Sequence, residues 1–261
     1  MLVTIKNDIE EDMEWEEVRH LPTKIGSRNF YNIICFTFDN DNGYYEKDYV
    51  KRCMESWKIR FPFSRFIFIN VDEVKKYSKW SLVTYQRKNF PTDSLRLLFT
   101  SQLNNALYID TDVFIRADAD LPLDLPDFVY ENCSGTMLWN KFANNKRMML
   151  WFVWYEKVAK DIAEGRANID DYCDCNAWAI YGKNLIPSFR TNRNFVNHFS
   201  GIWPFMRDKQ ILTLDSKGET VACFCNDSWW AFMSYCIERG YTDKVTMHSD
   251  KAVGTIIFHN T

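Results

Sequence analysis

Two aspartates, Asp110 and Asp112, stand directly after the short apolar run Ala106–Ile109. A continuous apolar run of this length predicts a buried strand. Ligands of open α/β sheets bind beyond the carboxyl ends of the strands. Two carboxylates two positions apart at such an end can converge on a hard divalent cation, directly or through water. The pair therefore indicates a metal site, although two solvated turn aspartates would show the same spacing.

A second charged pair lies upstream, in the segment Thr92-Asp-Ser-Leu-Arg96. It follows Pro91 at the start of a predicted helix, Asp93–Leu103, and residues three apart share one face of a helix. Asp93 can accept hydrogen bonds from sugar hydroxyls, and the Arg96 guanidinium suits phosphate or hydroxyl oxygens. The alternative is structural: Asp93 would complement the helix N-terminus while Arg96 pairs with it.

The elements that position these residues alternate between apolar strands and helices, which predicts an α/β sandwich with a largely parallel central sheet. The predicted strands are Asn32–Phe38, Phe66–Val71, Ala106–Ile109, one within Phe128–Leu138, and Thr255–Phe258. The predicted helices are Lys47–Phe61, Asp93–Leu103, Arg147–Gly165 and Ser228–Arg239. We expect one domain, and we interpret residues 1–30, which are rich in acidic side chains, as an appended leader.

In this context the two motifs resemble the Ser-Asp-x-x-Arg and Tyr-x-Asp-x-Asp-Val core of GT-A glycosyltransferases. The resemblance is closest to families 32 and 8, the group that contains the glycosylating bacterial toxins. Ser56-Trp57 ahead of Phe61-Pro62 is similar to a segment upstream of those motifs, so the likeness covers about a third of the chain, roughly Asn32–Ile115. The family usually has two glycines before the Asp-x-Asp strand, where this chain has Asn104 and Asn105; asparagine tolerates a left-handed backbone, so the turn can survive.

The resemblance implies a Rossmann-like GT-A fold, a three-layer α/β/α sandwich with a mostly parallel central sheet. It implies metal-dependent transfer of a hexose from a UDP- or GDP-sugar to a glycan or another hydroxyl-bearing acceptor, with retention of anomeric configuration. Residues 31–140 would bind the nucleotide sugar, and residues 141–261 would form the acceptor side. Mn²⁺ or Mg²⁺ would be bound by Asp110 and Asp112, and His259 would complete the metal shell.

The same resemblance assigns further residues to the donor. Thr37 and Asp39 would hold base and ribose. Apart from the resemblance, Tyr44 and Tyr45 follow a polar turn and are candidates for stacking on the base. Asp93, Arg96, Asp110 and Thr111 would contact the donor. Asn176 would border donor and acceptor ahead of a strand, or would simply be the polar entry to that strand. Asp227 or Ser228 would by default cap the helix that follows, and the alternative is that Asp227 is an acceptor-site or metal-linked carboxylate.

Two other functions fit the Asp-x-Asp strand. A haloacid-dehalogenase-type phosphohydrolase would use Asp110 as its nucleophile, but that motif normally stands near the N-terminus and has Thr or Val where this chain has Phe114. A sugar-binding module would keep the fold without turnover. A four-cysteine zinc site from Cys173-x-Cys175 and Cys223-x-Cys225 is disfavoured, because alternate cysteines on a strand share one buried face.

Composition excludes further classes of protein. Lys and Arg number 32 against 35 Asp and Glu, a formal charge of −3, so the basic excess of a general nucleic-acid binder is missing. No apolar stretch is long enough for a membrane-spanning helix. The N-terminus lacks the pattern of a secretory signal, so we expect a cytoplasmic protein with reduced cysteines.

Overall fold

The computed structural model describes residues 1–6, 10–37, 48–83, 90–111, 113–115, 117, 119–130, 137–172, 174–189, 196–198, 208–214, 220–225, 245–250 and 253–258. The chain forms two compact units that alternate along the sequence. The first unit contains residues 1–42, 61–110 and 121–190, and the second contains residues 43–60, 111–120 and 191–261. The expected single domain with a donor half and an acceptor half stays a prediction.

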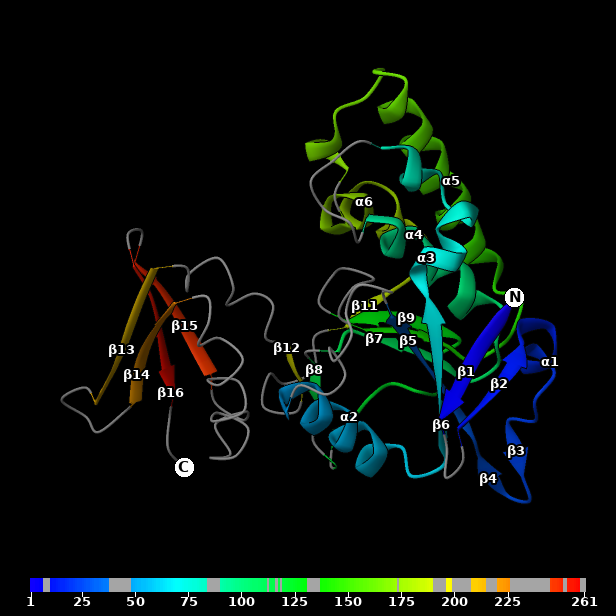
Figure 1. The fold of residues 1–261 in the computed structure, drawn as a ribbon, viewed down its shortest axis with the longest axis horizontal. Helices are drawn as coiled ribbons and strands as arrows, with labels where there is room; N and C mark the ends of the chain where they lie inside the picture. Colours follow the sequence, from blue (N-terminus) through cyan, green and yellow to red (C-terminus); the bar gives the residue numbers. More distant parts are fainter. Residues whose placement is uncertain are drawn as a thin grey trace. The chain divides into compact units, whose positions relative to one another are not determined.

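An eight-stranded mixed sheet is the centre of the first unit (Figure 1). Its strands are β1 (Leu2–Lys6), β2 (Glu10–Glu14), β5 (Tyr31–Thr37), β6 (Ser64–Asn70), β7 (Ala106–Ile109), β9 (Asp127–Tyr130), β10 (Met137–Asn140) and β11 (Ser188–Phe189). They lie in the order β11-β9-β10-β7-β5-β6-β1-β2, and β5 pairs in parallel with both β6 and β7. β10 runs antiparallel to its neighbours, as does β1. The predicted α/β class with a sheet that is parallel in its middle is confirmed.

The middle strands are buried on both faces, which explains why their sequences are continuous apolar runs rather than alternating ones. In β5, Ile33 and Ile34 point to opposite faces and both are fully buried. The predicted strand within Phe128–Leu138 is in fact two antiparallel strands, β9 and β10.

Two long helices, α4 (Phe90–Ser101) and α5 (Lys146–Ala163), pack against each other on one face of this sheet (Figure 1). The shorter helices of the unit are α1 (Trp15–Arg19), α3 (Val71–Val74) and α6 (Asp174–Ile180), with 3₁₀ turns at Lys75–Tyr77, Lys79–Leu82, Ile169–Asp171 and Gly182–Asn184. The predicted helices Asp93–Leu103 and Arg147–Gly165 are confirmed as α4 and α5, with ends shifted by one to three residues. A third layer of the sandwich stays a prediction.

A buried polar network fixes the start of α5. The Asn145 side chain accepts hydrogen bonds from the backbone N–H groups of Arg147 and Met148, the usual role of an N-cap. Its Nδ2 donates to Asp127 Oδ2 at 2.8 Å and to Asn140 Oδ1 at 2.9 Å. Both partners are fully buried strand residues. The helix is therefore held to β9 and β10 by directed bonds as well as by apolar packing.

The acidic N-terminal segment is part of the sheet, which differs from the leader expected for residues 1–30. β1 pairs with β2 and with β6, and Val3 and Ile5 are buried on alternate positions of β1. Trp15 and Val18 of α1 are also buried. The half-buried strand was missed because β1 itself is short and contains no acidic residue, whereas the carboxylates that dominate the segment belong to the neighbouring β2 and α1. A short hairpin, β3 (Lys24–Ile25) with β4 (Arg28–Asn29), follows.

The second unit contains α2 (Asp48–Arg60), which confirms the helix predicted at Lys47–Phe61, and two small sheets. β8 (Val113–Ile115) pairs antiparallel with β12 (Val196–His198). β13 (Asp208–Leu214), β14 (Thr220–Cys225), β16 (Val253–Phe258) and β15 (Val245–Asp250) form a four-stranded sheet in that order. The buried Trp57 of α2 donates its indole N–H to the backbone carbonyl of Val113 at 2.7 Å, which ties α2 to β8. The predicted helix Ser228–Arg239 lies outside the described residues.

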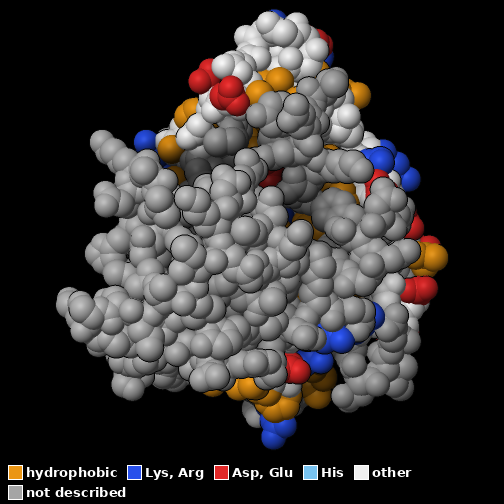
Figure 2. Space-filling view, turned by 60° about the vertical axis from the view of Figure 1, so that its left-hand side comes forward, with side chains coloured by type: hydrophobic (Ala, Val, Ile, Leu, Met, Phe, Trp, Pro, Cys, Tyr) orange, Lys and Arg blue, Asp and Glu red, His pale blue; other side chains and the backbone are white. Residues whose placement is uncertain are grey.

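The described surface carries charges of both signs. Acidic, basic and hydrophobic side chains are interspersed along the right-hand edge of the view in Figure 2. Within the described part of the chain, no helix combines the length and the apolar character that crossing a membrane requires.

Candidate functional site

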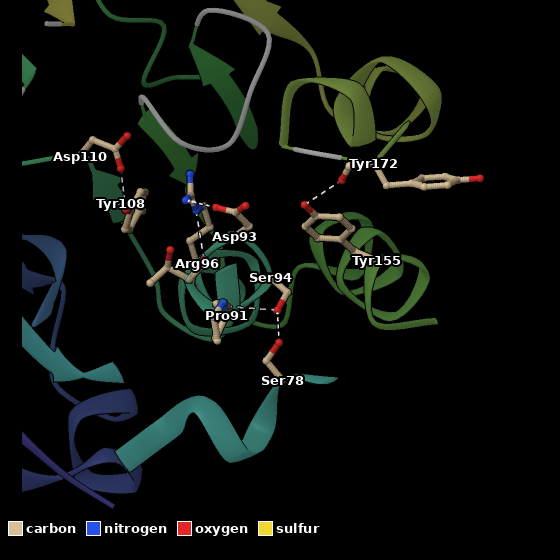
Figure 3. A network of polar contacts seen from close by, with 10 residues as sticks. Ser78, Pro91, Asp93, Ser94, Arg96, Tyr108, Asp110, Tyr155 and Tyr172 are labelled. Atoms are coloured by element: carbon tan, nitrogen blue, oxygen red, sulfur yellow. Dashed lines mark hydrogen bonds and ion pairs between the residues drawn. The ribbon is translucent and has the colours of Figure 1, made fainter. Parts of the chain in front are cut away.

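The motif residues Asp93, Arg96 and Asp110 belong to the first unit. Asp93 stands in the first turn of α4, with Arg96 one turn further on. Asp110 is the residue directly after β7, at the carboxyl end of the parallel part of the sheet. Because α4 leads back into β7, the start of the helix lies at the same edge of the sheet as the end of the strand. The structure therefore brings together two motifs that are 14 residues apart or more, as Figure 3 shows.

The turn that leads into β7 contains Asn104 and Asn105. Asn105 has a φ of +45°, in the left-handed region that asparagine tolerates better than most residues. The Asn104 carbonyl accepts a hydrogen bond of 2.8 Å from the Asn32 side chain, and its Oδ1 accepts one of 3.0 Å from the Ala143 N–H. The prediction that the turn survives without glycine is confirmed.

Asp93 and Arg96 form an ion pair on one face of α4. Arg96 Nη2 lies 2.6 Å from Asp93 Oδ1, and the two side chains are only 7% and 17% exposed, respectively. Arg96 Nε also donates to the backbone carbonyl of Thr92 at 3.1 Å. Two of the three guanidinium nitrogens are thus fixed within the helix, so the group is held in one orientation. The pairing is the one expected from the spacing, and it is compatible with both the functional and the structural interpretation.

Tyr108 connects this ion pair to Asp110. Its hydroxyl donates a hydrogen bond of 2.6 Å to Asp110 Oδ1, and the Arg96 guanidinium lies 5.0 Å above the centre of its ring (Figure 3). The first contact is a charge-assisted hydrogen bond and the second a cation–π interaction. Tyr108 is only 6% exposed, whereas Asp110 is half-buried. One side chain therefore orients both the guanidinium and the carboxylate.

Tyr108 is the first residue of the Tyr-x-Asp-x-Asp-Val motif, but the motif alone predicted no role for it. The signal was available, because Tyr108 and Asp110 are two positions apart along an extended segment and so face the same side. The contact with Arg96 could not be read from spacing, since it depends on how α4 packs across β7. We define Asp93, Arg96, Tyr108 and Asp110 as the β7 cluster.

The charges of the β7 cluster favour a cation. Two carboxylates and one guanidinium leave it with one net negative charge, and Asp112 follows in the sequence. Carboxylate oxygens are the ligands that Mg²⁺ and Mn²⁺ prefer. Among the described residues no three His, Cys, Asp or Glu side chains are grouped as a metal site, and two of the three predicted ligands, Asp112 and His259, lie outside those residues.

Thr37 and Thr111 are half-buried and lie near the cluster along the chain or the sheet. Thr37 ends β5, beside the end of β7, because β5 and β7 are parallel neighbours. The neighbouring residue Phe36 packs against Tyr108, with 5.6 Å between the ring centroids. Because successive residues of a strand point to opposite faces, Thr37 faces the side of the sheet opposite to Phe36. Thr111 follows Asp110 directly and is the first residue of the segment 111–120, which belongs to the second unit.

Asn176 does not lead into a strand, so that prediction is wrong. It lies in α6, where its exposed side chain donates to the backbone carbonyl of Asp170 at 3.0 Å.

The remaining candidates are distributed as follows. Asp39, Tyr44, Tyr45 and Asp227 lie outside the described residues, as do Asp112 and His259. Cys223 and Cys225 belong to the strand β14, whereas Cys175 belongs to the helix α6.

Comparison with known proteins gives no relative. No protein-family model, no curated protein and no solved structure matches the chain. The functional interpretation therefore depends on the motif residues and on their geometry.

Proposed function

We propose that the protein is a metal-dependent glycosyltransferase of the GT-A type, which moves a hexose from a UDP- or GDP-sugar to a hydroxyl-bearing acceptor. The observation that carries the proposal is the Tyr108 bridge, which joins the Asp93–Arg96 pair to Asp110 at the carboxyl end of β7. Sheets of this class bind their ligands at that edge.

Each member of the β7 cluster has a defined task in this proposal. Asp93 accepts hydrogen bonds from hydroxyl groups of the donor sugar, and Arg96 binds a hydroxyl or phosphate oxygen of the donor. Tyr108 keeps the Asp110 carboxylate in one orientation. These groups are already oriented by their mutual contacts, so they need little reorganisation when the donor binds.

Asp110 and Asp112 would hold Mn²⁺ or Mg²⁺ on the diphosphate of the donor. The donor set fits such an ion, since it consists of carboxylates and one of them is fixed by Tyr108 through Oδ1. A bound divalent cation supplies stabilisation of the negative charge that develops on the departing nucleoside diphosphate. In keeping with families 8 and 32, we propose retention of anomeric configuration and assign no protein nucleophile.

The proposal is tested by following release of nucleoside diphosphate and sugar transfer, with a panel of UDP- and GDP-sugars in the presence of Mn²⁺. We expect turnover by the wild type that Asp110→Asn reduces by about a hundredfold or more, as for other groups that stabilise transition-state charge. Asp12→Asn is the matched control, because Asp12 also accepts a hydroxyl hydrogen bond, from Thr4 at 2.7 Å, but lies on β2. Hydrolysis of an aryl phosphate without any nucleotide-sugar turnover would instead identify a phosphohydrolase.

A further inference from the structure

A carboxylate is buried in the middle of α5. Glu156 is 7% exposed, and its Oε1 and Oε2 accept hydrogen bonds from Ser78 Oγ at 2.8 Å and from the Lys79 backbone N–H at 2.5 Å. Among the described residues, no Lys, Arg or His forms an ion pair with it. Glu156 thus binds the start of the 3₁₀ turn Lys79–Leu82 through two directed bonds.

The same network continues into α4. The Ser78 hydroxyl has a single proton, which it donates to Glu156, so the 2.6 Å contact between Ser78 Oγ and Ser94 Oγ has Ser94 as the donor. Ser78 is 2% exposed and Ser94 is fully buried. A chain of hydrogen bonds therefore runs from Ser94 through Ser78 to Glu156 and joins α4 to α5. Figure 3 shows its first link, between Ser94 and Ser78.

Ser94 is the neighbour of Asp93 in the first turn of α4. Consecutive residues of a helix point in directions about 100° apart, so Ser94 faces inward to Ser78 while Asp93 faces its partner Arg96. Building on the function proposed above, we propose that Glu156 is a positioning residue. Through Ser78 and Ser94 it fixes the first turn of α4, and it thereby holds Asp93 and Arg96 in place for the donor.

Stability alone does not explain a carboxylate at this place. Removing a charge from water is unfavourable, and well-packed apolar side chains often replace buried charged groups without loss of stability. A fully hydrogen-bonded buried network, by contrast, specifies one arrangement of the elements that it joins. Glu156 therefore contributes a fixed geometry rather than stability, at the end of α4 that carries Asp93 and Arg96.

Three substitutions separate this role from a contribution to stability. Glu156→Ala leaves Ser78 and the Lys79 N–H without their acceptor. Glu156→Gln can keep the chain by reversing it: the amide oxygen accepts from Lys79, the amide N–H donates to Ser78, and Ser78 donates to Ser94. Ser94 then donates to the Pro91 carbonyl, which already lies 3.3 Å away. Ser94→Ala removes the last link together with the longer contact of the Ser94 hydroxyl with the Pro91 carbonyl, and we expect the loss of one hydroxyl to leave the fold intact.

The readouts are amide hydrogen exchange at residues 92–96 and the KM and kcat for the donor, measured well below each variant's melting temperature. We expect Glu156→Ala and Ser94→Ala to increase exchange at these residues and to raise the donor KM by about tenfold, the effect of one hydrogen bond of ordinary strength. kcat should change by less than about threefold, and Glu156→Gln should match the wild type. Glu164→Ala, at the exposed end of α5, is the control.

Unchanged exchange at residues 92–96 in both Glu156→Ala and Ser94→Ala, with only a lower melting temperature, would overturn the proposal. The exchange measurement needs no donor. If the wild type turned over no nucleotide sugar, the proposed function would fail, while increased exchange in these variants would still support the positioning of α4 by Glu156.

Discussion

Removing the Tyr108 hydroxyl tests the bridge between the two motifs with the smallest possible change. Tyr108→Phe deletes the hydrogen bond of 2.6 Å to Asp110 Oδ1. The ring itself remains, with its contacts to Phe36 at 5.6 Å and to the Arg96 guanidinium at 5.0 Å. The variant should therefore fold normally and lose only the orientation of the Asp110 carboxylate.

The size of the effect follows from the charge of the acceptor. A hydrogen bond to a charged group contributes about 1.5–3 kcal/mol, and loss of a partner that orients a metal ligand typically weakens metal binding by about 10–100-fold. Asp110 is only half-buried, so water replaces part of the lost interaction. We therefore expect the lower end of the range, about a tenfold weaker affinity for Mn²⁺ in the presence of nucleoside diphosphate.

Isothermal titration with Mn²⁺ measures this affinity, and Tyr155→Phe provides the matched control. Tyr155 is also buried, and its hydroxyl donates to the uncharged Tyr172 carbonyl at 3.1 Å. Both variants should lose about 1 kcal/mol of stability, but only Tyr108→Phe should lose metal affinity. Equal metal affinity in Tyr108→Phe and Tyr155→Phe would refute the assignment of Tyr108 as the residue that orients Asp110.

Three further predictions concern the scaffold. Asn145→Ala should lower the free energy of unfolding in urea by roughly 2 kcal/mol, because it removes the N-cap of α5 and the hydrogen bond to the buried Asp127. A decrease below about 0.5 kcal/mol would contradict this. Gly182→Ala should lower the free energy of unfolding by roughly 1–3 kcal/mol in the same assay, because the new Cβ would lie 2.7 Å from Trp151 Cζ2. Unchanged stability would contradict this, because it would mean that the Trp151 indole moves aside without a penalty. Burial raises the pKa of the Cys35 thiol, so iodoacetamide at mildly alkaline pH should alkylate Cys35 only after the protein unfolds. Peptide mass spectrometry measures the labelling. Alkylation of Cys35 in the folded protein at the rate seen in the denatured protein would contradict the prediction.

The central strands and helices could be predicted from the sequence because their physics is local. Ala106–Ile109 is fully apolar and buried on both faces, and the predicted strand agrees with β7 at both ends. The spacing of Asp93 and Arg96 predicted a shared helix face, and the two side chains do form an ion pair. The turn before β7 could be predicted too, because the tolerance of asparagine for a left-handed backbone conformation is a property of the residue itself.

The features that were missed depend on tertiary packing. Val3 and Ile5 alternate with polar residues, but a dense acidic segment masked this period, and pairing with β6 decides the outcome. The segment after Asn176 is short and mixed, so helix and strand could not be separated by pattern alone. The position of Arg96 over Tyr108 requires α4 to cross β7 at one particular place, which no local spacing encodes.

The most direct test of the central claim is the thermal stability of the protein against UDP- and GDP-sugars, with and without Mn²⁺, in the wild type and in Asp112→Asn. Binding to the native state alone raises apparent stability by RT ln(1 + [L]/Kd), so a true donor should raise Tm by several degrees. We expect this shift in the wild type with Mn²⁺ and not in Asp112→Asn, whose unliganded Tm should be unchanged. The same shift in Asp112→Asn, or no shift with any nucleotide sugar, would contradict a metal-dependent donor site at the end of β7.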